Sequence, residues 1–372
     1  MTILSMTEIL GWRNGEAISE EMHAGYVDLM AQRMGETFGQ ICRELPPLGE
    51  KLTTAASQVS DEGFIRVLIA PETCSHILTQ QVPDVRKKGL FFLKSFLAEA
   101  LREGQSLPEQ REIWTALGDF GFASDGSLHE WPQIEEMMPF DFGSPYATKV
   151  DLSGADRDSV PQRPPFSEAE LQRVIALLRR VRLCLNQTSP RIARFVSRFN
   201  KVLVLQKDAE APEKFASGSN GHYIGRSFLA NPHLPQIGEA HMADAIVHEG
   251  IHALLYMQEQ KEPWFVDPDI KRSFPKVKSP WTGSVISLAS FLQACFVWYG
   301  LLHFWSLALA ARTFDRTMAL TRMRLSLRGF LGQALRDHVW EFSPSIDQKV
   351  LSAIDEMQAM VAKAFSSVAS AL

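Results

Sequence analysis

Apolar residues recur at helical spacing over most of the first 120 positions. Met22, Tyr26, Met30 and Met34 follow one another at intervals of four. Residues four apart share one face of a helix, so this stripe predicts an amphipathic helix packed on a core. We therefore expect residues 1–122 to form a helical N-terminal region.

The helical pattern stops after this region. Residues 123–166 are rich in glycine, proline and acidic side chains, and they also include Trp131, Phe142 and Tyr146. Connections this long are either disordered linkers or functional loops, and the aromatic side chains argue against plain disorder. We expect an ordered lid or covering loop here, followed by a catalytic region over 167–372.

Regular elements return at residue 167. Ser167 and Glu170 have the spacing of a capping box that opens a helix. Residues 201–206 and 222–229 read as two strands separated by a polar turn, and a helix is expected from about 238 to 258.

A long uncharged stretch follows. Residues 279–311 contain no Asp, Glu, Lys or Arg. This length could span a bilayer, but Trp298 and Tyr299 lie mid-run, whereas interfacial aromatic residues lie at the ends of a span. We interpret it as a buried central helix packed against the 238–258 helix. The expected fold is α+β and mainly helical, with a small β-sheet next to the 238–258 helix.

Composition narrows the class of protein. The chain has 372 residues and a net charge of −5, which argues against a nucleic-acid surface. Its four cysteines have no paired spacing, and the N-terminus lacks a signal-peptide pattern. We therefore expect a cytoplasmic protein that is not embedded in a membrane. No glycine-rich phosphate loop is present, so nucleotide chemistry has no support.

The 238–258 helix carries the motif His248-Glu249-Gly250-Ile251-His252. Two histidines four apart lie on one helix face, so both imidazoles can bind one metal ion, with Glu249 beside them. Because the surrounding residues are apolar, buried imidazoles here need a partner. The alternative interpretation is a pair of hydrogen-bonded core histidines with a capping glutamate.

Two histidines do not complete a metal site, and the sequence restricts the third ligand. A metzincin would carry Gly and His where this chain has Leu255 and Gln258. His241 shares the helix face but lies about 10 Å away along the axis. The uncharged helix offers Gln293 and His303, and the 123–166 segment offers acids.

Six arginines follow the uncharged stretch. Their spacing is typical of a solvated helical face, and the alternative is a docking surface for an acidic peptide or a carboxylate. They are Arg312, Arg316, Arg322, Arg324, Arg328 and Arg336.

Several segments together resemble the HExxH-type peptide-modification family. Its members accompany ribosomally made, post-translationally modified peptides, and some are iron(II)- and 2-oxoglutarate-dependent β-hydroxylases of peptide side chains. The resemblance covers residues 201–305, and it extends to Phe142–Tyr146. The segments are His248–His252, Ser279–Gly283, Leu288–Ala294 and Phe304–Trp305.

The resemblance implies a cofactor and a ligand set. It implies Fe(II) held by His248, His252 and Gln293, since the family carries Gln or His at the third position. Facial ligation of this kind leaves positions for a keto acid and O2. Glu249 is the expected catalytic residue, and metal ligation, orientation of the metal and peptide binding remain open as its role.

The resemblance also implies where 2-oxoglutarate binds. The segment at Trp281 and Thr282 is expected to contribute to this site. In the family the tryptophan is often followed by Arg, whereas this chain has Thr282. Arg226, Lys278 or Arg312 would then hold the carboxylate.

The preferred function is hydroxylation of a side-chain carbon in a precursor peptide. The first alternative is a zinc metallopeptidase in which His248 and His252 bind Zn²⁺ and Glu249 is the general base. A third hypothesis is a metal-free fold that binds a leader peptide.

Overall fold

The computed structural model describes residues 3–78, 82–106, 112–147 and 164–365. The chain divides into two compact units, each assembled from stretches that are distant in sequence. These limits differ from the three consecutive regions 1–122, 123–166 and 167–372, because contacts between remote segments define each unit. Unit 1 comprises Met1–His23, Arg180–Val196 and Glu239–Leu372; unit 2 comprises Ala24–Arg179 and Ser197–Gly238.

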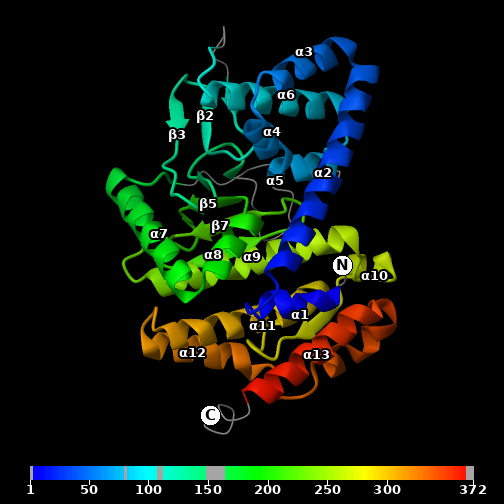
Figure 1. Cartoon of the computed structure of the whole chain (residues 1–372), viewed down its shortest axis with the longest axis vertical. Coiled ribbons are helices and arrows are strands. Elements are labelled where there is room, and N and C mark those ends of the chain that lie inside the picture. Colours follow the sequence, from blue (N-terminus) through cyan, green and yellow to red (C-terminus); the bar gives the residue numbers. More distant parts are fainter. Residues whose placement is uncertain (1–2, 79–81, 107–111, 148–163, 366–372) are drawn as a thin grey trace. The chain divides into compact units, whose positions relative to one another are not determined.

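Unit 2 begins with the helices that the apolar stripes predict. Tyr26, Met30 and Met34 are buried along α2, which confirms the first stripe. The helices up to residue 102 are α2 (Glu16–Glu44), α3 (Pro46–Ser57), α4 (Asp61–Leu68), α5 (Pro71–Ile77) and α6 (Val85–Arg102) (Figure 1).

The prediction of helix throughout residues 1–122 is wrong at its end. A three-stranded antiparallel sheet forms from β1 (Ile113–Trp114), β2 (Phe120–Phe122) and β3 (Leu128–Glu130). A left-handed glycine, Gly118 with φ of +75°, lies in the short turn between the first two strands. Such strands are too short to give a periodic signal that would separate them from a helix end.

A second sheet of unit 2 has the strand order β4-β5-β7-β6. The expected strands are present as β5 (Val202–Gln206) and β7 (Arg226–Ala230), which pair in parallel. The stretch between them was expected to be a turn, but it contains β6 (Ala216–Ser219), an antiparallel partner of β7. β4 (Phe140–Asp141) joins the other side of β5 in parallel.

The capping box at Ser167 is confirmed. The backbone N–H of Ser167 donates to Oε2 of Glu170 at 2.7 Å, and the Glu170 N–H donates to Oγ of Ser167 at 3.4 Å. This reciprocal pair opens α7 (Glu168–Thr188), and Pro190 then begins α8 (Pro190–Phe199).

The expected covering loop, residues 123–166, is described in part. Its residues 148–163 lie outside the described ranges. The described part contains β3 and β4, and its aromatic side chains pack on one another. The ring centroids of Trp131 and Phe142 lie 5.3 Å apart, and those of Phe142 and Phe166 lie 5.8 Å apart.

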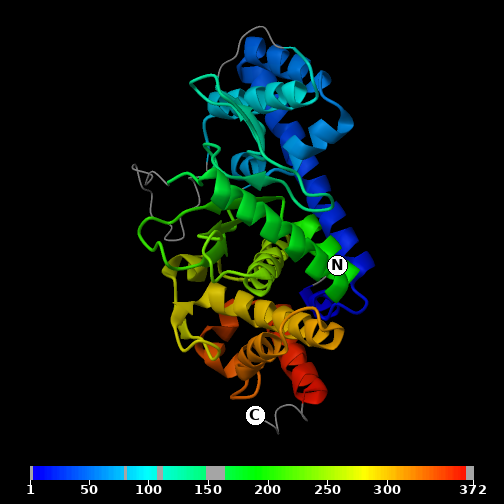
Figure 2. The same cartoon turned by 90° about the vertical axis from the view of Figure 1, so that its left-hand side faces the viewer.

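Unit 1 is built mainly from helices in the last third of the chain. α11 and α12 lie side by side in both views (Figures 1 and 2). Its elements are η1 (Ile3–Ser5), α1 (Met6–Leu10), α9 (Glu239–Lys261), α10 (Pro268–Ser273), β8 (Lys276–Lys278), β9 (Val285–Ser287), α11 (Leu288–Ala311), α12 (Arg316–Arg328), η3 (Leu335–Ser345) and α13 (Gln348–Ala364).

The uncharged stretch forms the expected central helix only from Leu288 onward. Its first part is the β8–β9 hairpin, and Ser287 then caps α11 by accepting a hydrogen bond from the Ser290 N–H. Among the described residues α11 is the one helix long and apolar enough to cross a membrane. Since 61% of its most apolar window is buried inside the protein, it has the character of a core helix.

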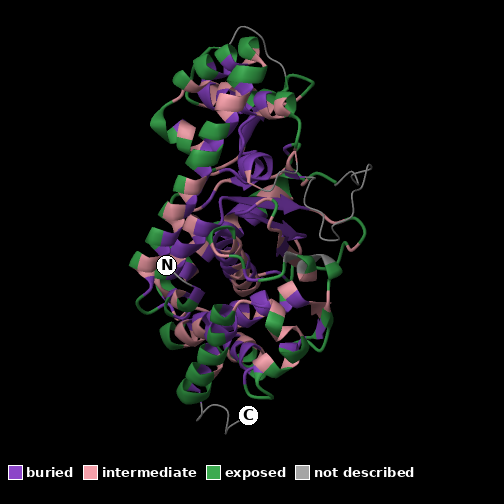
Figure 3. Cartoon of the chain, turned by 90° about the vertical axis from the view of Figure 1, so that its right-hand side faces the viewer, coloured by how far each residue is buried: buried purple, intermediate pink, exposed green. Residues whose placement is uncertain are grey.

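Burial follows the helix faces within each unit. Figure 3 shows exposed positions on the outer turns of the helices and buried positions on the sides that face the interior. In unit 1 the interior includes Trp264 against Phe296 and Trp305 against Phe304, with ring centroids 5.3 and 4.9 Å apart. The fold is therefore mainly helical α+β, as expected.

Trp281 fixes the hairpin to the helices behind it. Its indole N–H donates to the Ser326 carbonyl at 2.9 Å, and its ring stacks on Trp298 at 6.0 Å. Gly329 lies directly against this ring, where an added Cβ would overlap the indole. A methyl group at this position therefore has no room unless a buried aromatic ring moves.

Replacement of Gly329 by alanine is expected to destabilise unit 1. The added methyl group displaces Trp281, so the free energy of unfolding should fall by about 1–3 kcal/mol in urea titrations. Gly332→Ala is the matched control, because a Cβ there meets no atom within 4 Å. Equal stability of the two variants would contradict the packing described for Trp281.

Candidate metal centre

The two motif histidines converge on one point beside α9. They lie one turn apart, and the Nε2 atoms of His248 and His252 are 3.2 Å from each other. Nitrogen ligands lie about 2.1 Å from a metal ion, with angles of about 90–110° between them at the metal. Two such nitrogens are therefore about 3.0–3.4 Å from each other. The pair therefore has the separation that a shared metal requires. A hydrogen bond between the two rings gives a similar distance, so metal content separates the two interpretations.

The helix α11 holds one of these imidazoles in place. Nδ1 of His252 lies 2.8 Å from Oε1 of Gln293. Because an amide oxygen only accepts hydrogen bonds, Nδ1 carries the proton and the Nε2 lone pair faces His248. This is the tautomer that a metal ligand needs, and a hydrogen-bonded partner on the other ring nitrogen is typical of such ligands.

Gln293 was expected to be the third metal ligand, and the structure gives it a different contact. Its amide oxygen binds the ring nitrogen of His252 that points away from the His248 side. In this arrangement Gln293 orients the His252 ring, and metal ligation by Gln293 would require its amide to turn away from Nδ1.

The surroundings keep His252 neutral. Burial, and after it the neighbouring His248, lower the pKa of His252 to about 4, while Glu249 and the hydrogen bond with Gln293 act in the opposite direction. A neutral imidazole is the form that binds metal. Tyr256 stacks on the same ring one turn later, with centroids 6.0 Å apart, and Glu249 is buried beside the pair.

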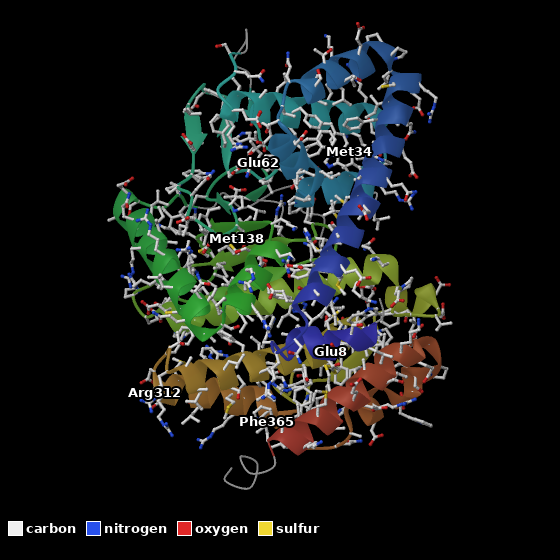
Figure 4. The ribbon with its side chains drawn as sticks, viewed as in Figure 1. Glu8, Met34, Glu62, Met138, Arg312 and Phe365 are labelled. Carbon is white, nitrogen blue, oxygen red and sulfur yellow. The ribbon has the colours of Figure 1, made fainter. Side chains whose placement is uncertain are left out.

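His303, the other expected candidate on α11, lies elsewhere. Its ring packs against Tyr299 at 4.5 Å and against Phe365 at 5.7 Å. Figure 4 labels Phe365, which follows α13. Burial and the charge of Arg13 lower the pKa of His303 to about 4. Its contacts place it among the aromatic side chains of the core.

The residues expected to bind 2-oxoglutarate are not gathered into one cluster. The indole N–H of Trp281 is bonded to Ser326, and Thr282 is exposed. Lys278 and Arg312 are exposed as well, and Figure 4 labels Arg312 at the end of α11.

Arg226 belongs to unit 2 and has a buried partner there. Its guanidinium lies 2.5 Å from a carboxylate oxygen of Glu72, donates to the Tyr146 carbonyl at 3.2 Å and lies over the Tyr223 ring. Both members of this ion pair are almost fully buried. Breaking such a pair leaves an uncompensated charge, so the contact holds unit 2 together.

Two polar residues on α9 were missed by the sequence analysis. Asp244 and Tyr256 continue the row of His248 and His252 at intervals of four, and this spacing is a signal that the sequence does contain. Asp244 accepts from the indole N–H of Trp305 at 2.6 Å.

Among the described residues no three His, Cys, Asp or Glu side chains form a group that could hold a metal ion. The spacing of the two imidazoles fits a metal, but the structure does not bring a third side chain of these types into position with them. No protein-family model matches the chain, and no curated protein matches it. The assignment therefore depends on the geometry of the histidine pair and on the motifs.

Metal analysis tests the pair directly. Protein purified without oxygen and supplied with Fe(II) is expected to hold about one equivalent, and the His248→Ala/His252→Ala variant is expected to hold none, since both nitrogens are lost. His241→Ala should keep the metal, because His241 lies two turns away on the same helix. Full metal content in the double variant would show that the histidines are only a core pair.

The contact with Gln293 gives a second expectation. Gln293→Leu removes the acceptor for Nδ1 of His252, so metal affinity should fall about 10- to 100-fold in a competition assay with a chelating dye. Gln260→Leu, an exposed change on α9, is the control. Unchanged affinity in the Gln293 variant would mean that the hydrogen bond does not orient the ligand.

Proposed function

We propose that the protein is an iron(II)- and 2-oxoglutarate-dependent hydroxylase that acts on a side-chain carbon of a ribosomally made peptide in the cytoplasm. The observation that carries the proposal is the 3.2 Å approach of two Nε2 atoms, one of them held in the metal-binding tautomer by Gln293. The choice of hydroxylation as the reaction comes from the resemblance to peptide-modifying proteins. That resemblance lies in the motif, the Ser279–Gly283 segment and the Leu288–Ala294 segment.

The ligands on this chain suit an anionic co-substrate. His248 and His252 are neutral when they bind, so they leave the charge of a divalent ion uncompensated. A keto acid that chelates through its carboxylate supplies the missing negative charge. Two protein nitrogens on one face also leave adjacent positions open for that chelate.

Each residue then has a definite task. His248 and His252 hold the metal, Gln293 orients His252, and buried Glu249 is placed to orient a bound group or to accept a proton from it. Iron(II) with 2-oxoglutarate supplies the oxidation of a C–H bond by O2. One oxygen atom enters the peptide, the other enters succinate, and carbon dioxide leaves.

The zinc metallopeptidase remains the alternative, since Glu249 is adjacent to the histidine pair and would serve as its general base. The position of a metzincin's third histidine is occupied by Gln258, which is buried and bonded at 2.5 Å to the Trp264 indole N–H. The helix α11, which packs on α9, carries no acid that would act as the third ligand of a gluzincin. Both points favour the oxygenase, and the intact His-Glu-His set argues against a metal-free peptide-binding fold.

The reaction itself separates the hypotheses. With Fe(II), 2-oxoglutarate, O2 and the precursor peptide, the product should be heavier by one oxygen atom, with one succinate formed for each peptide modified. The measurement is mass spectrometry of the peptide together with succinate quantification. Omission of 2-oxoglutarate should stop the reaction.

The control is the His248→Ala/His252→Ala variant, which should form neither product. Cleavage of the peptide by zinc-loaded protein without a keto acid would overturn the proposal in favour of the peptidase.

A further inference from the structure

One arginine of the basic run differs from its neighbours on α12. Arg316, Arg324 and Arg328 are exposed, as a solvated helical face requires. Arg322 is turned toward α9, and its side chain is only 29% exposed. The expectation of a solvated face is thus met by the exposed members of the run but not by Arg322.

This arginine has little to bind within the protein. Over the described ranges its one ion-pair partner is Asp244, at 3.4 Å between Nη1 and Oδ2. That distance is at the long limit for a hydrogen bond, and a guanidinium has five N–H donors. The side chain is 29% exposed, so its remaining donors reach solvent, where a ligand can take the place of water.

Asp244 has a second hydrogen bond, and this contact leaves the guanidinium of Arg322 available for a ligand. Its Oδ1 accepts from the indole N–H of Trp305 at 2.6 Å, which is the stronger of its two hydrogen bonds. The carboxylate therefore positions the guanidinium rather than saturating it. The charge of Arg322 also acts along α9, because after burial it is the main cause that lowers the pKa of His241.

Asp244, the partner of Arg322, lies on the same polar row of α9 as the histidine pair. Asp244 is one turn before His248, and side chains at this spacing have Cβ atoms about 5–6 Å apart. A five-carbon keto acid has its two carboxylate carbons about 5 Å apart, at carbon–carbon bonds of about 1.5 Å. A chelate at the histidine pair can therefore extend its far carboxylate toward Arg322.

We propose that Arg322 binds the second carboxylate of 2-oxoglutarate, with Asp244 and Trp305 setting its position. This inference rests on the proposed function and names the residue that would bind the far carboxylate of the co-substrate. It replaces the three cations expected from the sequence, since Arg226 is paired with Glu72 while Lys278 and Arg312 are exposed. It also accounts for an exposed, uncharged Thr282 at the position where the related proteins often carry arginine.

The test uses the full chain loaded with manganese(II), which does not turn over, and measures ligand binding by calorimetry. The ligands are 2-oxoglutarate and 2-oxobutyrate, a keto acid without the second carboxylate. The wild-type protein should prefer 2-oxoglutarate by about 10- to 100-fold, as expected for a paired carboxylate and guanidinium. Arg322→Met should remove this preference, and the exposed control Arg324→Met should retain it.

Two further variants cover the case in which Arg322→Met does not fold. Arg322→Lys keeps the charge but cannot form two parallel hydrogen bonds, so the preference should fall about tenfold. Asp244→Asn still accepts from Trp305 but no longer pairs with the guanidinium, so the preference should fall, because Arg322 loses the carboxylate that positions it. A purely structural ion pair predicts lower unfolding temperatures for these variants with the same ligand preference as wild type.

The failures of the two proposals are distinguishable. Full preference for 2-oxoglutarate in folded Arg322 variants overturns the role of Arg322 and leaves the hydroxylase proposal standing. Loss of affinity for the precursor peptide alone would assign Arg322 to a substrate carboxylate, which also overturns it. Wild-type protein that binds metal but neither keto acid overturns both.

Discussion

The packing of α9 against α11 is the constraint on which the candidate site depends. Ile251 lies where a Cβ on Gly300 would be, at 2.6 Å, so the absence of a side chain at residue 300 lets the helices approach. Hydrogen bonds join them on either side of this point, from His252 to Gln293 and from Trp305 to Asp244. Residue numbers rise on one helix as they fall on the other, so the two run antiparallel. Any shift between them would break both polar contacts.

The chemistry of the site follows from its two helices. The polar row on α9 packs beside α11, which has no charged residue. α11 has no Asp, Glu, Lys or Arg, so its surroundings are of low polarity and electrostatic interactions beside it are stronger than in water. Burial keeps His252 neutral and leaves its Nε2 lone pair available. Arg322 is 29% exposed and has one long contact with Asp244, so its guanidinium keeps donors for an anionic ligand.

Unit 2 contains a buried polar group of its own, which has a different character. Arg226 and Glu72 form a buried ion pair, and Asp141 accepts hydrogen bonds from the Gly143 and Ser144 N–H groups. Burial still raises the pKa of Asp141 to about 6, against the effect of these donors. The ion pair connects α5 with β7 inside this unit.

The sequence by itself determined the elements whose signal is local. The stripe at Tyr26, the capping box at Ser167 and the uncharged run of α11 each depend on residues within a few turns, and the structure has all three. The pairing of His248 with His252 is equally local, because helical geometry alone brings side chains four apart onto one face.

Only the tertiary structure decided which side chains and strands contact these local elements. Each of the short strands β1, β2 and β6 is held by pairing with the strand that follows it, and the chain near them has no period that reveals them. Gln293 was found as a candidate from its polarity in an apolar helix. Its contact with Nδ1 of His252, 41 residues earlier in the chain, depends on the register of α9 against α11. Arg322 looked like its exposed neighbours, and only the packing of α12 turned it toward Asp244. Contacts of this kind depend on how helices pack, which is a property of the whole core and not of any short segment.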